Sequence, residues 1–546
     1  MIKSRYQSFS LFLLLIIFLA SLLRLYQLGD IPFGLTNDEA GIIYSGYSIF
    51  KTGKDPTGKF LPFSINLDNS FSPVYIYAIA PFVGFLGLNP FNGRLLFALS
   101  GVGSVLVLAL LVRSLFKNDQ IALLSALILT ISPWHFHLSR AAFDANFALF
   151  FYLLGIYLFI TQLQRGSLVF SLIAFLLAFY SYHATKIFFL FLIPVLFYVY
   201  LPQLLVRKKQ ILIFTIGCGL ILVSFAYFMK FQAASSRTSV LLFNKEQIDK
   251  AAKMVDWERT KSTAPFFFRS IFNNKPLYFL RVIRENYLEV FSPHFLFLYG
   301  DTFGLPYVNP YFRGQMYIIE LPLLFFGLLY FLRIKDSQLK KLWFMLLLIA
   351  PLPSTFNYDK TYIFRSVMLL PILSVIVAAG IYFFWTKLKE ESSFRQNIIK
   401  GFFLFLYFFL FASYFFQYFY RYPVYGAEGW FRSSRELSEY LNKGKSKYKN
   451  IYLVEAGDMF IFQYAVFNKV APNMVMEAWR SSYPKKINGI TLLSGCLNEG
   501  LGNPNDFLSP ETLYIVGDKY HRDIPPDETI DDFGEPLRTI WKIYKK

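Results

Sequence analysis

The chain has few charged residues and almost no cysteine. Only 16% of its 546 residues are charged, whereas a soluble domain carries about 25%. The two cysteines, Cys218 and Cys496, lie far apart, which excludes a disulfide framework or a cysteine-based metal site built from this pair. We find no basic patch with a nucleic-acid-binding motif and no solenoid-type repeat. The net charge of +19 therefore does not indicate DNA or RNA as a partner.

Hydrophobic residues make up 55% of the chain and aromatic residues 20%. Because a bilayer core takes about 20 mostly apolar residues per helix, the repeated apolar runs predict a polytopic α-helical membrane protein with about eleven transmembrane helices. We expect the spans near residues 8–28, 93–115, 119–138, 143–163, 168–182, 187–205, 210–229, 314–333, 341–353, 364–386 and 400–420.

The first span follows Lys3 and Arg5 and resembles a signal peptide. No small-residue cleavage site follows its apolar run, and Arg24-Leu-Tyr-Gln comes instead. We therefore expect an uncleaved signal anchor.

Lys and Arg gather in alternate connections between the spans, which predicts the orientation of the chain. Lys and Arg favour the cytoplasmic side of a membrane, so these basic segments, and with them the N-terminus, are expected to be cytoplasmic. The basic segments are the N-terminus, 113–117, Arg165, 207–209, 333–341 and 387–400. The other loops, and the segment after 420, are then external.

Two external loops are long, about 29–92 and about 230–312. Within the first loop, 73–88 is apolar but too short to span the bilayer comfortably and is interrupted by prolines, which predicts a juxtamembrane or re-entrant helix.

After residue 420 the apolar runs shorten and alternate, as in strands at Asn450 and Thr512, with a helical stretch at 433–441 before them. We expect a transmembrane catalytic domain over 1–420 and a small external α/β domain over 421–546.

Two adjacent carboxylates, Asp38 and Glu39, follow the first span. Acids beside a membrane are costly and usually mark function, so this pair is a candidate catalytic site. Asn37 or Asp38 could equally cap a helix that begins at Glu39, where the helix dipole favours carboxylates. The spacing alone leaves both interpretations open.

Asp144 lies on the same predicted face, four residues after Arg140. It is either a second functional acid or half of an ion pair worth a few tenths of a kcal/mol. His135 and His137 have ligand-type spacing but are more often simple interfacial polar groups. We assign no metal site, and a divalent cation held by these acids and histidines is not expected.

Three cations stand at external helix ends: Lys186, Arg365 and Arg94. Each side chain could simply place its charged end at the membrane–water interface while its apolar stem lies in the bilayer. The functional interpretation is that they bind the phosphate of a lipid-linked donor, a task for which the guanidinium fork of arginine is suited.

Several motifs, in order along residues 20–420, resemble bacterial family 39 glycosyltransferases. This group is similar to protein O-mannosyltransferases and aminoarabinose transferases and has the GT-C fold. The motifs are Asp38-Glu39, the stretch from Tyr44 to Gly58, Pro90-Phe-Asn-Gly-Arg94, Ser132-Pro-Trp134, Ser139-Arg140 with Asp144, and Gly300-Asp301. The segment after 420 matches no family that we can name.

The resemblance implies a glycosyltransferase of the bacterial inner membrane that uses a sugar on a polyprenyl phosphate. The first-loop acid that acts on the acceptor maps onto Asp38, and the acid of the second external loop onto Asp144. Arg365 matches a basic residue at the external start of a late helix, whereas Lys186 has only positional support. Some relatives use a basic residue in the first loop. Its candidate counterparts here are Lys51, Lys54 and Lys59, and we do not choose between them.

The chemistry favours the same scheme, because transfer needs a base for the acceptor and cations for the leaving phosphate. Direct displacement with one base would invert the anomeric carbon. The acceptor is expected to be a protein, lipid or glycan of the cell envelope, and no cofactor is expected. The alternative function is a transporter or flippase for lipid-linked saccharides, although the acids lie at helix ends rather than at the bilayer midplane.

Overall fold

The computed structural model describes most of the chain. Its described residues are 2–67, 70–231, 242–301, 307–308, 310, 313–358, 360–454, 456–494, 509–518, 525–532 and 538–546. Cys496, part of the predicted loop 230–312 and part of the predicted external domain lie outside these ranges.

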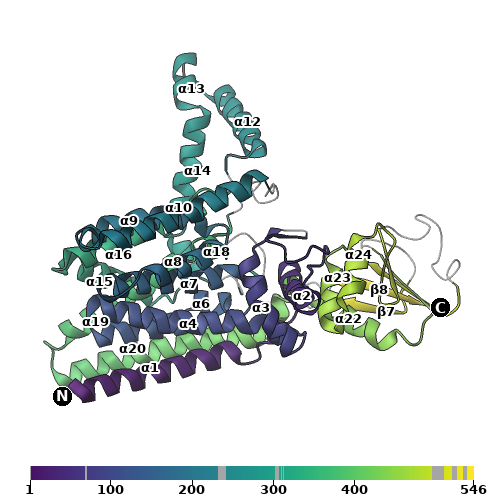
Figure 1. The fold of residues 1–546 in the computed structure, drawn as a ribbon, viewed down its shortest axis with the longest axis horizontal. Helices are drawn as coiled ribbons and strands as arrows, with labels where there is room; N and C mark the ends of the chain where they lie inside the picture. Colours follow the sequence, from purple (N-terminus) through teal and green to yellow (C-terminus); the bar gives the residue numbers. More distant parts are fainter. Residues whose placement is uncertain are drawn as a thin grey trace.

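A long helical bundle forms the body of the molecule, and a mixed sheet lies at one end of it (Figure 1). Within the described residues, seven helices are long and apolar enough to cross a membrane. They are α1 (Ile2–Leu25), α4 (Pro90–Phe116), α7 (Asp144–Arg165), α9 (Thr185–Leu205), α10 (Lys208–Phe231), α19 (Leu369–Leu388) and α20 (Ser393–Phe416).

The remaining four predicted spans are shorter helices of 11 to 14 residues: α5 (Asp119–Ile131), α8 (Val169–Phe179), α15 (Glu320–Arg333) and α16 (Ser337–Ile349). The predicted span 119–138 is broken because Pro133 starts a new helix, α6 (Pro133–Leu138), directly after α5. Proline lacks the N–H that would continue the α5 hydrogen-bond ladder. The total of eleven crossings remains a prediction.

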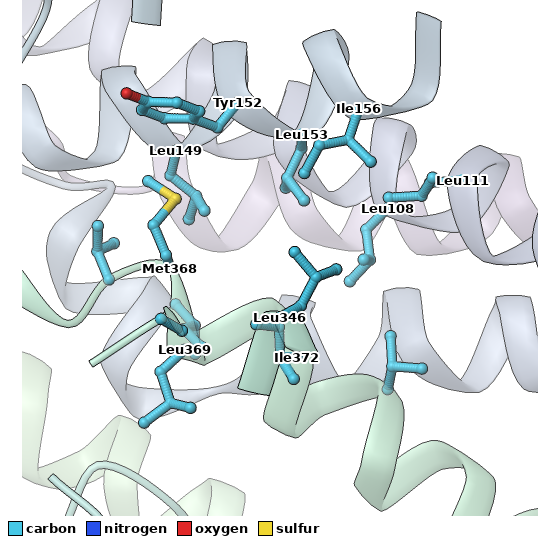
Figure 2. Close-up of a cluster of buried hydrophobic side chains, with 14 of the residues drawn as sticks. Leu108, Leu111, Leu149, Tyr152, Leu153, Ile156, Leu346, Met368, Leu369 and Ile372 are labelled. Carbon is cyan, nitrogen blue, oxygen red and sulfur yellow. The ribbon is translucent and has the colours of Figure 1, made fainter. Parts of the chain in front are cut away.

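Buried aliphatic side chains from several helices fill the bundle. Figure 2 shows leucines of α4 and α7 facing Leu346 of α16 and Leu369 and Ile372 of α19. Two glycines bring α15 and α19 into backbone contact: a Cβ on Gly327 would lie 2.0 Å from the Ile376 carbonyl oxygen, and one on Gly380 would lie 2.0 Å from that of Leu323. Such close packing is typical of helices associated within membranes.

The first predicted external loop contains two helices, α2 (Asn37–Thr52) and α3 (Pro73–Phe85). The prediction of a short helix near 73–88 is confirmed, but Pro81 does not interrupt it, and Pro73 occupies its first turn. Both helices lie at the end of the bundle that carries the sheet (Figure 1). At the opposite end, Arg113 of α4 stacks on Phe9 of α1, with 3.8 Å between the guanidinium carbon and the ring centroid.

The C-terminal sheet has the strand order β4-β5-β3-β6-β8-β7. Its two central strands, β3 (Asn450–Val454) and β6 (Thr512–Gly517), are the two predicted strands, and they pair in parallel. The predicted helix before them is α22 (Arg432–Gly444). The other elements are α23 (Phe460–Asn468), α24 (Pro472–Arg480), β4 (Lys485–Ile487), β5 (Ile490–Leu493), β7 (Glu528–Asp531) and β8 (Thr539–Lys545).

This C-terminal unit shares one hydrophobic core with α2 and α3. Polar contacts reinforce the junction: Tyr44 of α2 donates to the Val470 carbonyl at 2.7 Å, and Gln463 of α23 donates to the Leu35 carbonyl at 3.2 Å. Burial raises the pKa of the Tyr44 phenol above its ordinary range, so this hydroxyl remains a neutral donor. The first loop is therefore packed between the bundle and the sheet.

Candidate active site

A cavity of about 460 Å³ lies where α2, the start of α7 and the segment before α19 meet. Four of the six sequence-predicted site residues line it: Asp38, Glu39, Asp144 and Arg365. The rest of its wall is largely aromatic and polar, and comprises Thr36, Asn37, Ile42, Phe71, Tyr75, Ala142, Phe143, Tyr182, Tyr307, Val308, Thr361, Phe364 and Phe431.

Asp38 and Glu39 occupy the first turn of α2. The N-cap of this helix is Thr36, whose side-chain oxygen accepts a hydrogen bond from the Glu39 N–H at 3.2 Å. The cap is thus neither Asn37 nor Asp38, and the helix begins at Asn37 rather than at Glu39. Thr36 performs the capping, and the Asp38 carboxylate is exposed.

Glu39 forms a buried ion pair with Arg94 of α4. The guanidinium Nε and Nη2 of Arg94 donate to the two carboxylate oxygens at 2.8 and 2.9 Å, and the two side chains are 0% and 2% exposed. Glu39 also accepts from the Ala142 N–H at 3.0 Å. This carboxylate therefore connects α2, α4 and the segment that leads into Asp144.

Arg94 does not line the cavity, although the sequence predicts that it binds the donor phosphate. Its remaining donors reach the carbonyl oxygens of Leu28, Pro32 and Gly34 at 3.0, 2.8 and 2.6 Å. The guanidinium is thus saturated by Glu39 and by the loop before α2. Its place in the structure is that of a residue that positions the first loop.

Asp144 is the first residue of α7, directly after Phe143. Arg140 does not pair with it, because its guanidinium donates instead to the carbonyl oxygens of Leu23 and Ile31 at 2.8 and 3.0 Å. Arg140 therefore forms hydrogen bonds to the backbone at and just after the end of the first span. It does not form the ion pair that the four-residue spacing suggests. Asp144 lies at the amino end of α7, where the helix dipole favours a carboxylate.

Arg365 ends the short helix α18 (Tyr362–Arg365). Its guanidinium donates to the hydroxyl of Thr361, which also lines the cavity. The backbone two residues before it is held on both sides of Ile363: the buried Asp301 accepts from the Ile363 N–H at 3.0 Å, and the Trp134 indole donates to the Ile363 carbonyl at 2.8 Å. Two motifs of the sequence, Ser132-Pro-Trp134 and Gly300-Asp301, thus converge two residues from Arg365.

Replacing Asp301 with alanine is expected to lower turnover by up to about 10²-fold, because the Ile363 backbone loses its bond to the Asp301 side chain and small misplacements are costly in catalysis. The matched control is Asp336→Ala, which removes an equivalent 3.0 Å bond to the Leu339 N–H at the start of α16. Thermal unfolding and turnover are measured for both variants. Equal losses of turnover in the two would contradict a positioning role for Asp301.

Lys186 does not line the cavity. Its Nζ lies 3.4 Å from His183 Nδ1, and within 5.5 Å of the ring centroids of Phe179 and Phe225. The nearest cavity residue along the chain is Tyr182.

Both histidines considered as metal ligands have protein partners. Arg24 donates to His135 Nδ1 at 2.7 Å, and His137 Nε2 lies 2.8 Å from the Tyr307 carbonyl oxygen. In the described part of the chain, no three His, Cys, Asp or Glu side chains gather as a metal-ion site.

Sequence reasoning missed most of the cavity wall. Tyr75 and Tyr182 carried no signal that separates them from other interfacial aromatic residues. Phe431 precedes α22, has a φ of +53°, and reaches the cavity from the segment after 420. Positive φ is uncommon for a bulky side chain, and a single sequence does not reveal it.

Comparison with known families matches residues 11–239 to dolichyl-phosphate-mannose-protein mannosyltransferases. The matched part includes Asp38, Glu39, Arg94, Asp144 and Lys186, but not Arg365 or the C-terminal unit. No curated protein sequence matches the chain.

The solved structures that are similar to this chain include an ArnT and an oligosaccharyltransferase. ArnT from Cupriavidus metallidurans bound to undecaprenyl phosphate has a TM-score of 0.50 and 12% identity, over 99% of this chain and 98% of ArnT. The Archaeoglobus fulgidus oligosaccharyltransferase in its apo form has a TM-score of 0.47 and 12% identity, over 84% of this chain. The chain spans 63% of the length of that oligosaccharyltransferase.

The likeness to ArnT confirms the predicted fold class, a multi-pass helical membrane protein of GT-C type with a small C-terminal sheet. Together with the family match over residues 11–239, it supports the prediction of a glycosyltransferase.

Proposed function

We propose that this protein is a membrane glycosyltransferase that moves a sugar from a polyprenyl phosphate to an acceptor on the non-cytoplasmic face. The observation that carries the proposal is the single cavity in which Asp38 and Asp144 meet Arg365. A base for the acceptor and a cation for the leaving phosphate are the minimum set for this transfer.

The donor is a lipid-linked sugar whose phosphate binds at Arg365. The guanidinium fork of arginine matches phosphate oxygens, and the Asp301 and Trp134 contacts hold the backbone of Ile363, two residues before Arg365. The ArnT structure that shares this fold is bound to undecaprenyl phosphate, which supports a polyprenyl carrier. Such a carrier also delivers sugar to a face of the membrane that cytosolic nucleotide sugars do not reach.

Asp38 acts as the base. An acceptor hydroxyl attacks the anomeric carbon, its proton passes to the Asp38 carboxylate, and the bond from the anomeric carbon to the phosphate oxygen breaks. The electron pair of that bond stays on the polyprenyl phosphate, whose added charge Arg365 stabilises. Attack opposite to the leaving phosphate inverts the anomeric carbon.

Asp144 and Glu39 have supporting roles in this scheme. Asp144 lines the cavity and orients the acceptor, which is a protein, lipid or glycan. Glu39 is held by Arg94 and by the Ala142 N–H, so it sets the relative positions of Asp38 and Asp144 and does not take the proton.

Membranes that contain the protein and a labelled polyprenyl-phosphate sugar test the proposal. The expected result is a new labelled product, whose mass identifies the acceptor, and release of polyprenyl phosphate in equal amount. If the labelled lipid instead changes sides of the membrane without losing its sugar, the protein is a flippase and the proposal is wrong.

Replacing Arg365 with glutamine is expected to slow transfer by about 10²-fold, which is typical when one group that stabilises developing negative charge is removed. The matched control, Lys360→Gln, removes the same charge from an exposed position five residues earlier and is expected to leave transfer nearly unchanged. Initial rates are measured over a range of donor concentrations. An Arg365→Gln variant as active as the Lys360→Gln variant would exclude the phosphate-binding role.

A further inference from the structure

Three helices of the predicted loop 230–312 form an arm beside the bundle: α12 (Lys245–Lys261), α13 (Phe266–Phe272) and α14 (Lys275–Glu289). Figure 1 shows the arm projecting across the direction of the long helices α1, α4 and α20. Membrane-spanning helices are tilted on average by about 20° from the bilayer normal, so an arm that runs across them lies closer to the membrane plane than to the normal.

The tip of the arm is strongly apolar and exposed. Phe266, Phe267 and Phe272 are 83%, 68% and 67% exposed, and no residue of α13 is buried. Phe268 and Ile271 extend the same patch at 50% and 43% exposure. Contiguous exposed apolar residues of this kind mark a surface that binds a partner or a membrane.

The charge around the tip has one sign. Residues 259–275 include Arg259, Lys261, Arg269 and Lys275 and no acidic residue. Aromatic residues beside a cluster of cations are the composition of segments that bind anionic lipid headgroups and insert apolar side chains beneath them. These cations also exclude burial of the tip in the hydrocarbon core. The tip is therefore expected at the interface between the headgroups and the hydrocarbon.

The tip is held in shape by internal bonds. Arg259 donates from Nε to the Asn273 carbonyl at 2.8 Å, and Arg269 donates to the Ala264 carbonyl. Nearer the base, Arg281 of α14 pairs with Glu258 of α12 at 2.8 Å. The phenylalanines are therefore presented by a folded hairpin of helices.

The base of the arm is tied to the segment that carries Arg365. Asn286 of α14 is 3% exposed and donates to the Thr355 and Asn357 carbonyls at 3.2 and 2.8 Å. The Tyr362 hydroxyl donates to the side-chain oxygen of Asn286 at 3.0 Å, three residues before Arg365. The arm thus connects the cavity to a surface outside the bundle.

We propose that the arm docks on the external surface of the bilayer, with its basic residues on anionic phospholipid headgroups and Phe266, Phe267 and Phe272 inserted beneath them. The arm is a membrane-surface contact additional to the transmembrane helices. This inference does not depend on the reaction that the protein catalyses.

A spin label on the tip tests the docking. Phe267→Cys is made in a chain with Cys218→Ala and Cys496→Ser, labelled with a nitroxide, and reconstituted into vesicles that contain phosphatidylglycerol. We expect the label to collide several-fold more often with oxygen than with a water-soluble nickel complex, as in lipid. The matched label, at Lys253→Cys on the charged helix α12, is expected to show the opposite preference.

Two further measurements address the charge and the fold. Lys261→Glu with Lys275→Glu, or vesicles of phosphatidylcholine alone, are expected to move the Phe267 label toward water, while circular dichroism of the variant stays unchanged. A label at 267 that is water-exposed in phosphatidylglycerol vesicles overturns the docking. If the label at 267 lies equally deep in both kinds of vesicle and in the Lys261→Glu, Lys275→Glu variant, the arm does not recognise anionic lipid. If the label is exposed to water in vesicles and becomes protected only when another protein is added, the patch binds a protein partner and not the membrane.

Discussion

Replacing Asp38 with asparagine is expected to reduce sugar transfer by about 10²- to 10⁴-fold, the usual contribution of a general base. Asparagine keeps the shape of the side chain but does not accept a proton at neutral pH. The fold should persist, because Thr36 caps α2 and the lost interaction of Asp38 with the helix dipole is worth only about 0.3–1 kcal/mol. The rate is measured with labelled donor, and stability is followed by thermal unfolding.

Two comparison variants make this result specific. Asp30→Asn removes an exposed carboxylate from the segment between α1 and α2, where it lies 3.5 Å from Arg435, and should leave the rate nearly unchanged. Asp144→Asn removes the other acid of the cavity. If Asp144→Asn abolishes transfer and Asp38→Asn retains it, Asp144 is the base and the assignment is reversed.

Replacing Glu39 with glutamine is expected to destabilise the protein by about 3–5 kcal/mol, because the buried Arg94 guanidinium would lose its counter-charge. Arg94→Ala should cost as much, since it removes the counter-charge of the buried Glu39 carboxylate and the donor to the Gly34 carbonyl. Thermal unfolding in detergent and the yield of folded protein measure the loss. Transfer should fall in proportion to the folded fraction or further, because the pair sets the first loop.

The exposed pair Lys387 and Glu390 supplies the control, with side chains 59% and 70% exposed. Lys387→Ala should change stability by less than about 1 kcal/mol. The double variant Glu39→Leu with Arg94→Met should recover part of the loss, because it leaves no unpaired buried charge. An Arg94→Ala variant that is fully stable but binds donor poorly would restore the phosphate-binding role predicted from the sequence.

Much of this architecture follows from the sequence, for identifiable reasons. The length of the apolar runs predicted where the helices lie, because a helix that crosses the hydrocarbon core needs about 20 mostly apolar residues. The charge bias and the ordered motifs grouped Asp38, Asp144 and Arg365 on one face, and the structure gathers these residues at one cavity. The central strands β3 and β6 were evident from their alternating apolar runs.

The partners of buried cations were not predictable in the same way. A single sequence marks Arg94 and Lys186 as cations at helix ends, but not whether they face a ligand, a carboxylate or an aromatic ring. Only the fold brings Glu39 within 2.8 Å of Arg94, across 55 residues of chain. The cap at Thr36 was missed because Asn37 and Asp38 are stronger N-cap types in the same window.

The contacts of α2 also have a consequence for how the protein is made. The helix that carries Asp38 emerges from the ribosome early, yet Gln463 bonds to the Asn37 side chain at 3.0 Å and Arg480 to the Thr57 carbonyl at 2.8 Å. Contacts this distant in sequence form late. Until the C-terminal unit is made, the segment that carries Asp38 lacks these contacts. On the proposed mechanism, sugar transfer begins only once the C-terminal unit has been synthesised and has folded against α2.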